Sequence, residues 1–264
     1  MQIPESILES LEQKQINAAT SFLADEIAPC FRGVICGDSE SSSLTSRLGG
    51  KVLLPREIGH PCDRSGKPMS LVAQINFSEL PAAEFDYAKQ GLLILFCNAA
   101  RDFSNPKDRN AFRCVWIANP VENNYVDSAF PDATVSSAKA LNFSLSLSLP
   151  EDLAAGNDEQ AQMAKQISNA LEKDRQIQLF GKGGKDFDVL QEIAAFAGNG
   201  ISWSEARRTD SCFSHLVESA AEWKLLLKMN STDYFDLADR SLYLLIRDED
   251  LKQQSYGKSW LVVR

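Results

Sequence analysis

The sequence has few residues of the types that perform catalysis or hold metal ions. Its 264 residues include only two histidines, His60 and His215, and six cysteines with no Cys-x-x-Cys pair. Cys212 with His215 could form a thiolate nucleophile, and His60 with Cys62 could begin a metal site. No GxSxG or HExxH motif supports either chemistry. We therefore expect structural roles for these residues, no catalytic or metal site, and no cofactor.

Positive charge and long apolar runs are also scarce. The 27 Lys and Arg residues against 36 Asp and Glu residues give a formal net charge of −9. Such a surface repels phosphate backbones and anionic lipids, so we expect neither nucleic acid nor membrane as a partner and favour a basic protein. The longest apolar run, Leu92 to Cys97, is far shorter than the roughly 20 residues that a membrane-spanning helix needs.

The cysteines favour a reducing compartment. They are scattered along the chain, and Cys97 lies within the apolar run, where a thiol behaves as a small hydrophobic group. The first ten residues, MQIPESILES, have neither the basic segment nor the apolar segment of a signal peptide. We therefore expect a cytoplasmic protein in which all six cysteines are reduced.

Hydrophobic periodicity predicts an N-terminal helix followed by several strands. Apolar residues recur at helical spacing from Ile3 to Ile27, before Pro29. Leucine and phenylalanine alternate with serine and asparagine from Leu141 to Leu149, which predicts a strand with one buried face. Further helices are expected after Asp158 and over 187–197. Other strands are expected at 31–36, 71–77, 91–96, 112–118, 223–229, 242–246 and 260–263.

Glycine and proline punctuate the stretch before the strand at 71–77. The pair Gly49-Gly50 suits positive φ or a close backbone approach, where a side chain would clash. Pro55 and Pro61 remove amide donors, so residues 51–63 are expected to be irregular coil. The sequence Ser-Gly-Lys-Pro at 65–68 predicts a turn. We assign structural roles to Gly49, Gly50 and Pro55.

The two halves of the chain share a pattern. Leu48-Gly49-Gly50 precedes LVAQIN, GLLILF and RCVWI, and Leu179-Phe180-Gly181 precedes KLLLKMN, SLYLLI and SWLVV. This pattern gives Gly181 a structural role like that of the first double glycine. We predict an α+β fold with mixed or antiparallel sheets in two tandem related units, about 28–150 and 151–264. The N-terminal helix would pack across both units in one compact domain, 1–264.

The same segments carry a resemblance. SRLGGKVLLP, GKPMSLVAQINFSELP, GLLILFC and WKLLLKMNSTDYFDLADRSLYLLIRDEDL closely resemble the YwqG-like family, a bacterial domain of unknown function. The resemblance covers most of the chain from Leu48 onward, together with the N-terminal helix. It implies a single α+β protein with internal duplication, and it brings no reaction, cofactor or catalytic residue. It also suggests an immunity role beside toxin systems. Where such proteins carry a Trp-Gly-Asp-x-Gly hairpin, residues 234–239 contain no glycine.

Two groups of polar residues are candidate binding sites. Gln74 and Asn76 share one face of the strand at 71–77, and the repeat places Lys228 and Asn230 at the matching positions. They could line a groove or satisfy the backbone of a neighbouring loop. Asp233, Asp236 and Asp239 could bind a cation or contact a basic partner, although turn chemistry suits them better. A second acidic run follows at 248–250.

These observations favour a non-enzymatic, cytoplasmic, protein-binding protein, of which an immunity-type inhibitor of a basic toxin is one form. The alternative is a small-ligand-binding protein or an enzyme that uses a polar groove near Gln74 and Asn76. The sequence GKGGK at 181–185 lacks the spacing and the hydroxyl of a phosphate-binding loop, so we do not expect nucleotide binding there.

Overall fold

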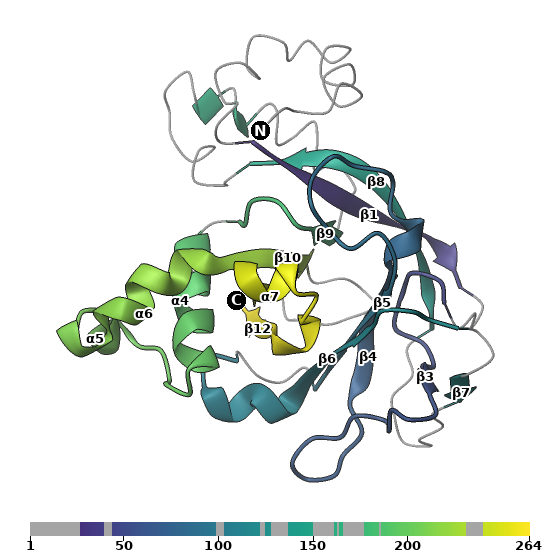
Figure 1. The fold of residues 1–264 in the computed structure, drawn as a ribbon, viewed down its shortest axis with the longest axis horizontal. Coiled ribbons are helices and arrows are strands. Elements are labelled where there is room, and N and C mark those ends of the chain that lie inside the picture. Colours follow the sequence, from purple (N-terminus) through teal and green to yellow (C-terminus); the bar gives the residue numbers. More distant parts are fainter. Residues whose placement is uncertain are drawn as a thin grey trace.

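Two long strands, β1 (Ala28–Asp38) and β8 (Lys139–Ser148), pair at the middle of a ten-stranded sheet (Figure 1). The computed structural model describes residues 27–39, 44–98, 103–121, 125–127, 137–149, 161–162, 164–165, 177–184, 186–230 and 240–264. Leu141 and Phe143 of β8 are buried while Asn142 and Ser144 are exposed, as the period of two predicts.

An arm of strands extends from each side of this central pair. The order of the whole sheet is β12-β11-β10-β9-β1-β8-β2-β4-β5-β6. One arm contains β2 (Arg47–Leu48), β4 (Ser70–Asn76), β5 (Leu92–Cys97) and β6 (Phe112–Ile117). The other contains β9 (Ile177–Leu179), β10 (Trp223–Asn230), β11 (Ser241–Arg247) and β12 (Trp260–Val263). A separate two-stranded sheet pairs β3 (Leu53–Pro55) with β7 (Tyr125–Asp127).

The expected division into two tandem α+β units is wrong. Among the described strands every pair is antiparallel, and all but β3 and β7 belong to one sheet. The physical reason is that β1 bonds to β8 on one side and to β9 on the other, so the backbone hydrogen bonding of the two halves is continuous. The helix expected from Ile3 to Ile27 falls almost wholly on residues 1–26, outside the described residues.

The two arms share a backbone conformation and a hydrogen bond directly after their first strand. After the short first strand of each arm, two residues have positive φ: Gly49 (58°) and Gly50 (82°) in one arm, Phe180 (61°) and Gly181 (80°) in the other. The amide of Gly49 donates to the carbonyl oxygen of Val72, and that of Phe180 donates to the carbonyl oxygen of Leu226. Common ancestry of the two halves stays a prediction from the sequence.

The sheet curls until its two terminal strands, β6 and β12, approach each other. The rings of Phe112 on β6 and Trp260 on β12 are 5.5 Å apart in an edge-to-face contact. The short turn η7 (Tyr256–Lys258) fills the gap, with the Tyr256 ring 4.2 Å from that of Trp116. Arg109 donates to the carbonyl oxygens of Gly257 and Ser259, which joins the segment before β6 to the segment before β12.

Helices cover the arm that contains β10 to β12 (Figure 1). The longest described helix, α4 (Phe187–Gly198), confirms the one expected over 187–197 and buries Leu190, Ile193 and Phe196. It is followed by α5 (Glu205–Arg208) and α6 (Ser214–Ser219), and α7 (Asp248–Lys252) follows β11. The short turns are η1 (Phe77–Glu79), η2 (Pro106–Ala111), η5 (Ser211–Phe213) and η6 (Ala220–Glu222).

Candidate functional site

Gln74 and Asn76 are both bonded to the chain segment before β2. Gln74 is fully buried, its Nε2 donates to the carbonyl oxygen of Thr45 at 2.8 Å, and its Oε1 accepts from Arg47 at 3.4 Å. The Nδ2 of Asn76 donates to the carbonyl oxygen of Leu44 at 2.8 Å. These bonds satisfy loop backbone, the second of the two roles that the sequence left open for this pair.

The matching positions in the other arm are arranged differently. Lys228 lies opposite Gln178 in the register of β10 with β9, and Gln178 makes the loop contacts there, donating to the carbonyl oxygens of Phe180 and Lys182. Asn230 is exposed and its Oδ1 accepts from the hydroxyl of Ser241 at 3.0 Å. The structure therefore does not bring Asn230 together with Gln74 and Asn76 through any described contact.

The acidic candidates divide into two sets. Asp233, Asp236 and Asp239 lie outside the described residues. In the second run, Asp248 pairs with Lys252 at 2.6 Å, and the buried Asp250 pairs with Lys258 at 2.6 Å. Glu249 approaches Arg247 at 3.8 Å. Each carboxylate of the run at 248–250 thus has a cation of the same chain beside it, which reduces the charge that it presents to a partner.

The predicted structural residues lie at close approaches. A Cβ on Gly50 would be 2.5 Å from the Cβ of Ala138, and a Cβ on Gly181 would be 2.2 Å from the Oγ of Ser148. Pro55 is buried at the end of β3. Substituting either glycine therefore requires both a strained φ and a movement of its neighbour.

The histidines and cysteines form no metal cluster within the described part of the chain. His60 bonds through Nε2 to the carbonyl oxygen of Met69 at 2.9 Å, and its ring packs edge-on against Phe96. A hydrogen bond with Asp210 raises the pKa of the exposed Cys212 thiol, the opposite of what a nucleophilic thiolate needs. Burial raises the pKa of Cys97 and of Cys114 to about 12.

The feature that the sequence did not reveal is the outer edge of β6, which η7 borders at Gly257. Among the described strands, β6 is last in the sheet order and pairs with β5 alone, without a register shift (Figure 1). The amide of Asn98 donates to the carbonyl oxygen of Ala111, which continues the same register. In an antiparallel pair, residues alternate between pointing both main-chain groups at the partner and pointing both away. The register therefore directs the N–H and C=O of Phe112, Cys114 and Trp116 away from β5.

The outward main-chain groups of Phe112 and Cys114 border a hollow. A cavity of about 710 Å³ is lined by four consecutive residues of β6, 112–115, by residues 57–59 and 61–62, and by Gly257 of η7. No backbone partner is recorded on the outer side of β6 among the described residues. We call this cavity the edge groove. A smaller cavity of about 280 Å³, lined in part by Arg64 and Lys107, shares Asn110 with it.

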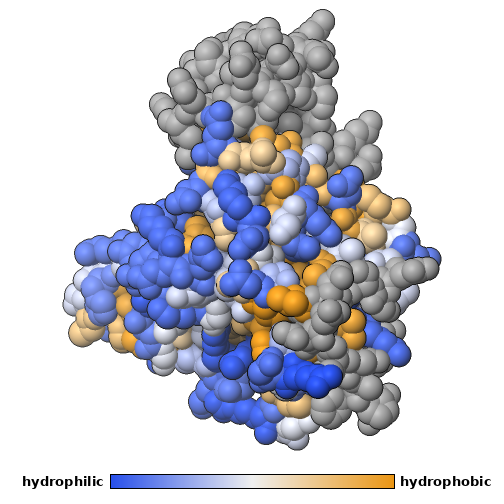
Figure 2. Space-filling view, turned by 45° about the vertical axis from the view of Figure 1, so that its right-hand side comes forward, coloured by the Kyte–Doolittle hydropathy of each residue, from blue (hydrophilic) through white to orange (hydrophobic). Residues whose placement is uncertain are grey.

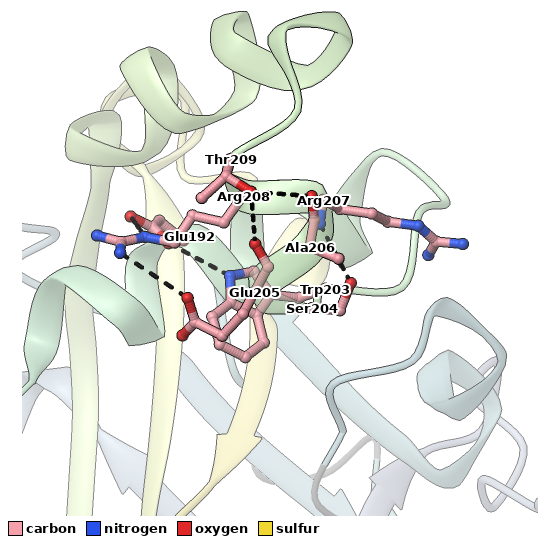
Figure 3. Close-up of polar contacts among 8 residues, drawn as sticks. All are labelled: Glu192, Trp203, Ser204, Glu205, Ala206, Arg207, Arg208 and Thr209. Atoms are coloured by element: carbon pink, nitrogen blue, oxygen red, sulfur yellow. Dashed lines mark hydrogen bonds and ion pairs between the residues drawn. The ribbon is translucent and has the colours of Figure 1, made fainter.

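A second polar cluster joins α4 to α5 (Figure 3). The buried carboxylate of Glu192 accepts from the Nε of Arg208 at 2.9 and 2.8 Å, and from the indole Nε1 of Trp203 at 3.3 Å. These hydrogen bonds and the electrostatic attraction raise the pKa of Arg208. The side chain of Ser204 caps α5 by accepting from the amide of Arg207. The cluster's bonds all lie within the chain, so it positions α5 against α4.

The face of the molecule drawn in Figure 2 carries both hydrophilic and hydrophobic residues. In the space-filling view the left-hand side is mainly hydrophilic, while hydrophobic residues gather near the middle (Figure 2). Val121 is an exposed large hydrophobic side chain, with 54% of its surface accessible. Within the described residues, no helix combines the length and the apolar character needed to span a membrane.

Comparison with known proteins assigns the chain to a family without assigning a reaction. Comparison with curated proteins gives no significant match. A family model described as "Domain of unknown function (DUF1963)" matches residues 46–264, which is most of the chain. The match is consistent with an uncharacterised domain and does not confirm the YwqG-like name. The chain belongs to the DUF1963 family of domains of unknown function.

Proposed function

We propose that this chain is a protein-binding protein that receives an extended segment of its partner at the outer edge of β6, which pairs with no second strand among the described residues. The observation that carries the proposal is that the outward main-chain groups of Phe112 and Cys114 border the edge groove, and those of Trp116 continue the same edge. A strand that adds to an open sheet edge gains main-chain hydrogen bonds, while pockets beside the edge select its side chains.

The regularity of β6 supports this use. Edge strands are commonly protected by short length, bulges, proline or inward charges, because an open edge pairs readily with other chains. The other terminal strand, β12, has four residues, whereas β6 has six with an uninterrupted register. β6 contains no proline, and its one charged residue, Arg113, is exposed. Such an edge is suited to a specific partner.

The proposal includes the finer expectations from the sequence. They include a non-enzymatic, cytoplasmic role, and six free cysteines, three of them buried, support the reducing compartment. An immunity-type inhibitor of a basic toxin is one form of such a role, supported by the net charge of −9. The alternative, a ligand groove beside Gln74 and Asn76, has less support because both amides are bonded to residues 44–45.

The experiment that tests the function is a selection of octapeptides from a random library, followed by binding to a blocked variant. Gly257→Leu suits this purpose because its Cβ would lie 3.7 Å from the carbonyl oxygen of Cys114, an ordinary van der Waals contact that requires no movement of the backbone. The leucine side chain would then occupy the groove beside the edge. Ala221→Leu, at an exposed position of η6, is the matched control.

We expect the selected peptides to bind wild type and Ala221→Leu with equal affinity. Their affinity for Gly257→Leu should be lower by about tenfold or more. In hydrogen exchange, the amides of Phe112, Cys114 and Trp116 should exchange faster than those of Arg113 and Val115, and bound peptide should slow them. Equal binding to both leucine variants, with no change in these amides, would refute the proposed function.

A further inference from the structure

We propose that the segment bound at β6 is acidic, with a carboxylate side chain opposite Arg113 and a second one two residues later. This inference rests on the proposed function and adds the chemistry of the partner. Three observations carry it: the pairing geometry of Arg113, the local excess of cations around the edge groove, and the position of Gly257.

The first observation is the pairing geometry of Arg113. Its own N–H and C=O point at Phe96 of β5, because the register places these two residues in a hydrogen-bonded pair. Toward an added strand Arg113 therefore occupies a non-hydrogen-bonded position. At such positions the Cα atoms are about 4.5 Å apart rather than about 5.5 Å, so opposed side chains are closest. Arg113 is exposed and lines the groove, so its guanidinium can meet a carboxylate there.

The second observation is that the groove is locally basic in an acidic protein. Its lining includes Arg109 and Arg113 against Glu57, and the adjoining smaller cavity adds Arg64 and Lys107 against Asp63. That is four cations and two carboxylates, in a chain of net charge −9. Screening limits the influence of exposed charges to about 8 Å at physiological salt, so these neighbours outweigh the distant net charge for a bound segment.

Not all of these charges are equally available. The carboxylate of Asp63 already accepts from the amides of Ser65 and Lys67, from the hydroxyl of Ser65 and from Asn98. The guanidinium of Arg109 donates to carbonyl oxygens of η7 and the residue after it. Because Asp63 and Arg109 already make these hydrogen bonds, the charged side chains that remain to act on a bound segment are the cations Arg113, Arg64 and Lys107 and the carboxylate Glu57.

Arg64 is held at the border between the two cavities. With its amide turned to satisfy both groups, the side-chain oxygen of Asn110 accepts from Arg64 Nε at 2.8 Å and from Nη2 at 2.9 Å. Asn110 lines both cavities. An antiparallel segment that places one carboxylate opposite Arg113 therefore carries its next same-face residue toward Asn110, Arg64 and Lys107.

The third observation defines the other face of the bound segment. Gly257 lies beside the carbonyl oxygen of Cys114, because a Cβ on this glycine would be 3.7 Å from that oxygen. The residue opposite Cys114 must therefore be small. On the outer face, Val115 and Ile117 pack against the apolar cluster of β3, β4 and β5, so apolar partners suit the positions opposite them. Opposite residues 117 to 111 in turn, the bound segment should therefore carry the residue types apolar, any, apolar, small, acidic, any and acidic.

A synthetic peptide tests this pattern directly. The probe is acetyl-Thr-Ile-Thr-Val-Ser-Glu-Thr-Glu-amide with a fluorophore, and its binding is measured by anisotropy. In the proposed register its Val lies opposite Val115, its Ser opposite Cys114 and its first Glu opposite Arg113. The comparison peptide has Lys at both Glu positions. Arg113→Glu reverses the charge on the protein, and Lys224→Glu makes the same change on β10 in the other arm.

We expect the acidic peptide to bind wild type and Lys224→Glu about tenfold more tightly than the lysine peptide, with a preference that falls as salt rises. Arg113→Glu should reverse the preference. N-methylation of the Ser should abolish binding, because its N–H faces Cys114, whereas N-methylation of the Val should leave binding intact, because that N–H faces away.

The outcomes separate the two proposals. If both peptides bind equally and N-methylation of the Ser still abolishes binding, the acidic partner is refuted and strand addition stands. If N-methylation at the Ser and at the Val have the same effect, or neither peptide binds, strand addition and the acidic partner are both refuted. Protection of the exposed Cys62 thiol, which lines the groove, from alkylation by the bound acidic peptide gives an independent readout.

Discussion

Replacement of Gly50 by alanine should destabilise the protein through two separable effects. Gly50 has φ of 82°, a region where a Cβ costs about 1–2 kcal/mol per residue. The new Cβ would also lie 2.5 Å from the Cβ of Ala138 and 3.1 Å from its Cα. Because backbone borders the site, the overlap cannot be relieved by a side-chain rotation alone.

Gly66 provides a control with nearly the same backbone conformation. Its φ is 80°, and a Cβ there would meet no atom within 4 Å. Gly66→Ala therefore incurs the φ penalty, reduced by the 0.4–1 kcal/mol or so gained from a less flexible unfolded chain. Gly50→Ala incurs the same terms and in addition an overlap that typically costs about 1–3 kcal/mol. We expect the free energies of unfolding of the two variants to differ by that last amount.

Chemical denaturation of wild type and both variants measures this difference. The denaturation midpoint should fall modestly for Gly66→Ala and clearly further for Gly50→Ala, with similar slopes. Adding Ala138→Gly to Gly50→Ala removes the closest atom and should recover part of the loss, which a double-mutant cycle would report as coupling. If Gly50→Ala and Gly66→Ala have the same midpoint, the contact with Ala138 does not constrain this turn.

Three further predictions follow from other groups. A thiol titration of the denatured, unreduced protein should find six thiols, and fewer than six would indicate a disulfide. In the native protein the exposed Cys36, Cys62 and Cys212 should react first, because burial raises the pKa of Cys97 and of Cys114 to about 12. The hydroxyl of Ser65, followed by nearby amides, lowers the pKa of Asp63, so this carboxylate stabilises the fold above its unfolded pKa near about 4, and the effect is lost as pH falls through the lower folded value. Asp63→Asn should therefore lower the melting temperature more at pH 7 than at pH 3, and an equal loss at both pH values would contradict this reasoning. Glu192→Gln should lower the melting temperature by a few degrees, because the hydrogen bond that both carboxylate oxygens accept from Arg208 Nε loses its negative charge. A melt identical to wild type would show that α5 is not held by this pair.

The local elements could be read from the sequence because their signals are local. The alternation from Leu141 to Leu149 predicted β8, and the apolar run at 92–97 predicted β5, which is buried at every position. The double glycine indicated positive φ, and both residues have it. In each case the information lies within a few residues, since side-chain period and allowed φ depend on near neighbours.

The candidate site was harder to anticipate because its defining property belongs to the sheet. Gln74 and Asn76 attracted notice as polar residues in a strand, yet each bonds to loop backbone about thirty residues earlier in the chain. The sequence FRCVWI of β6 does not indicate whether this strand pairs with one neighbouring strand or with two. The exposed Arg113 is the only local sign, since a charge suits a strand with an accessible face.

The sequence by itself indicated the longer strands and the turn at the double glycine, because burial of apolar side chains and steric limits on the backbone act locally. It did not indicate the short strands β2, β7 and β9, and the coil expected over 51–63 contains β3. Only the tertiary structure decided that β1 joins both halves through β8 and β9, so that one continuous sheet replaces the two tandem units expected. It also decided that β6 is an edge and which of its amides face outward. Strand order and register are set by the sum of many contacts between residues far apart in the chain, and a change of register by one residue exchanges the inward and outward groups.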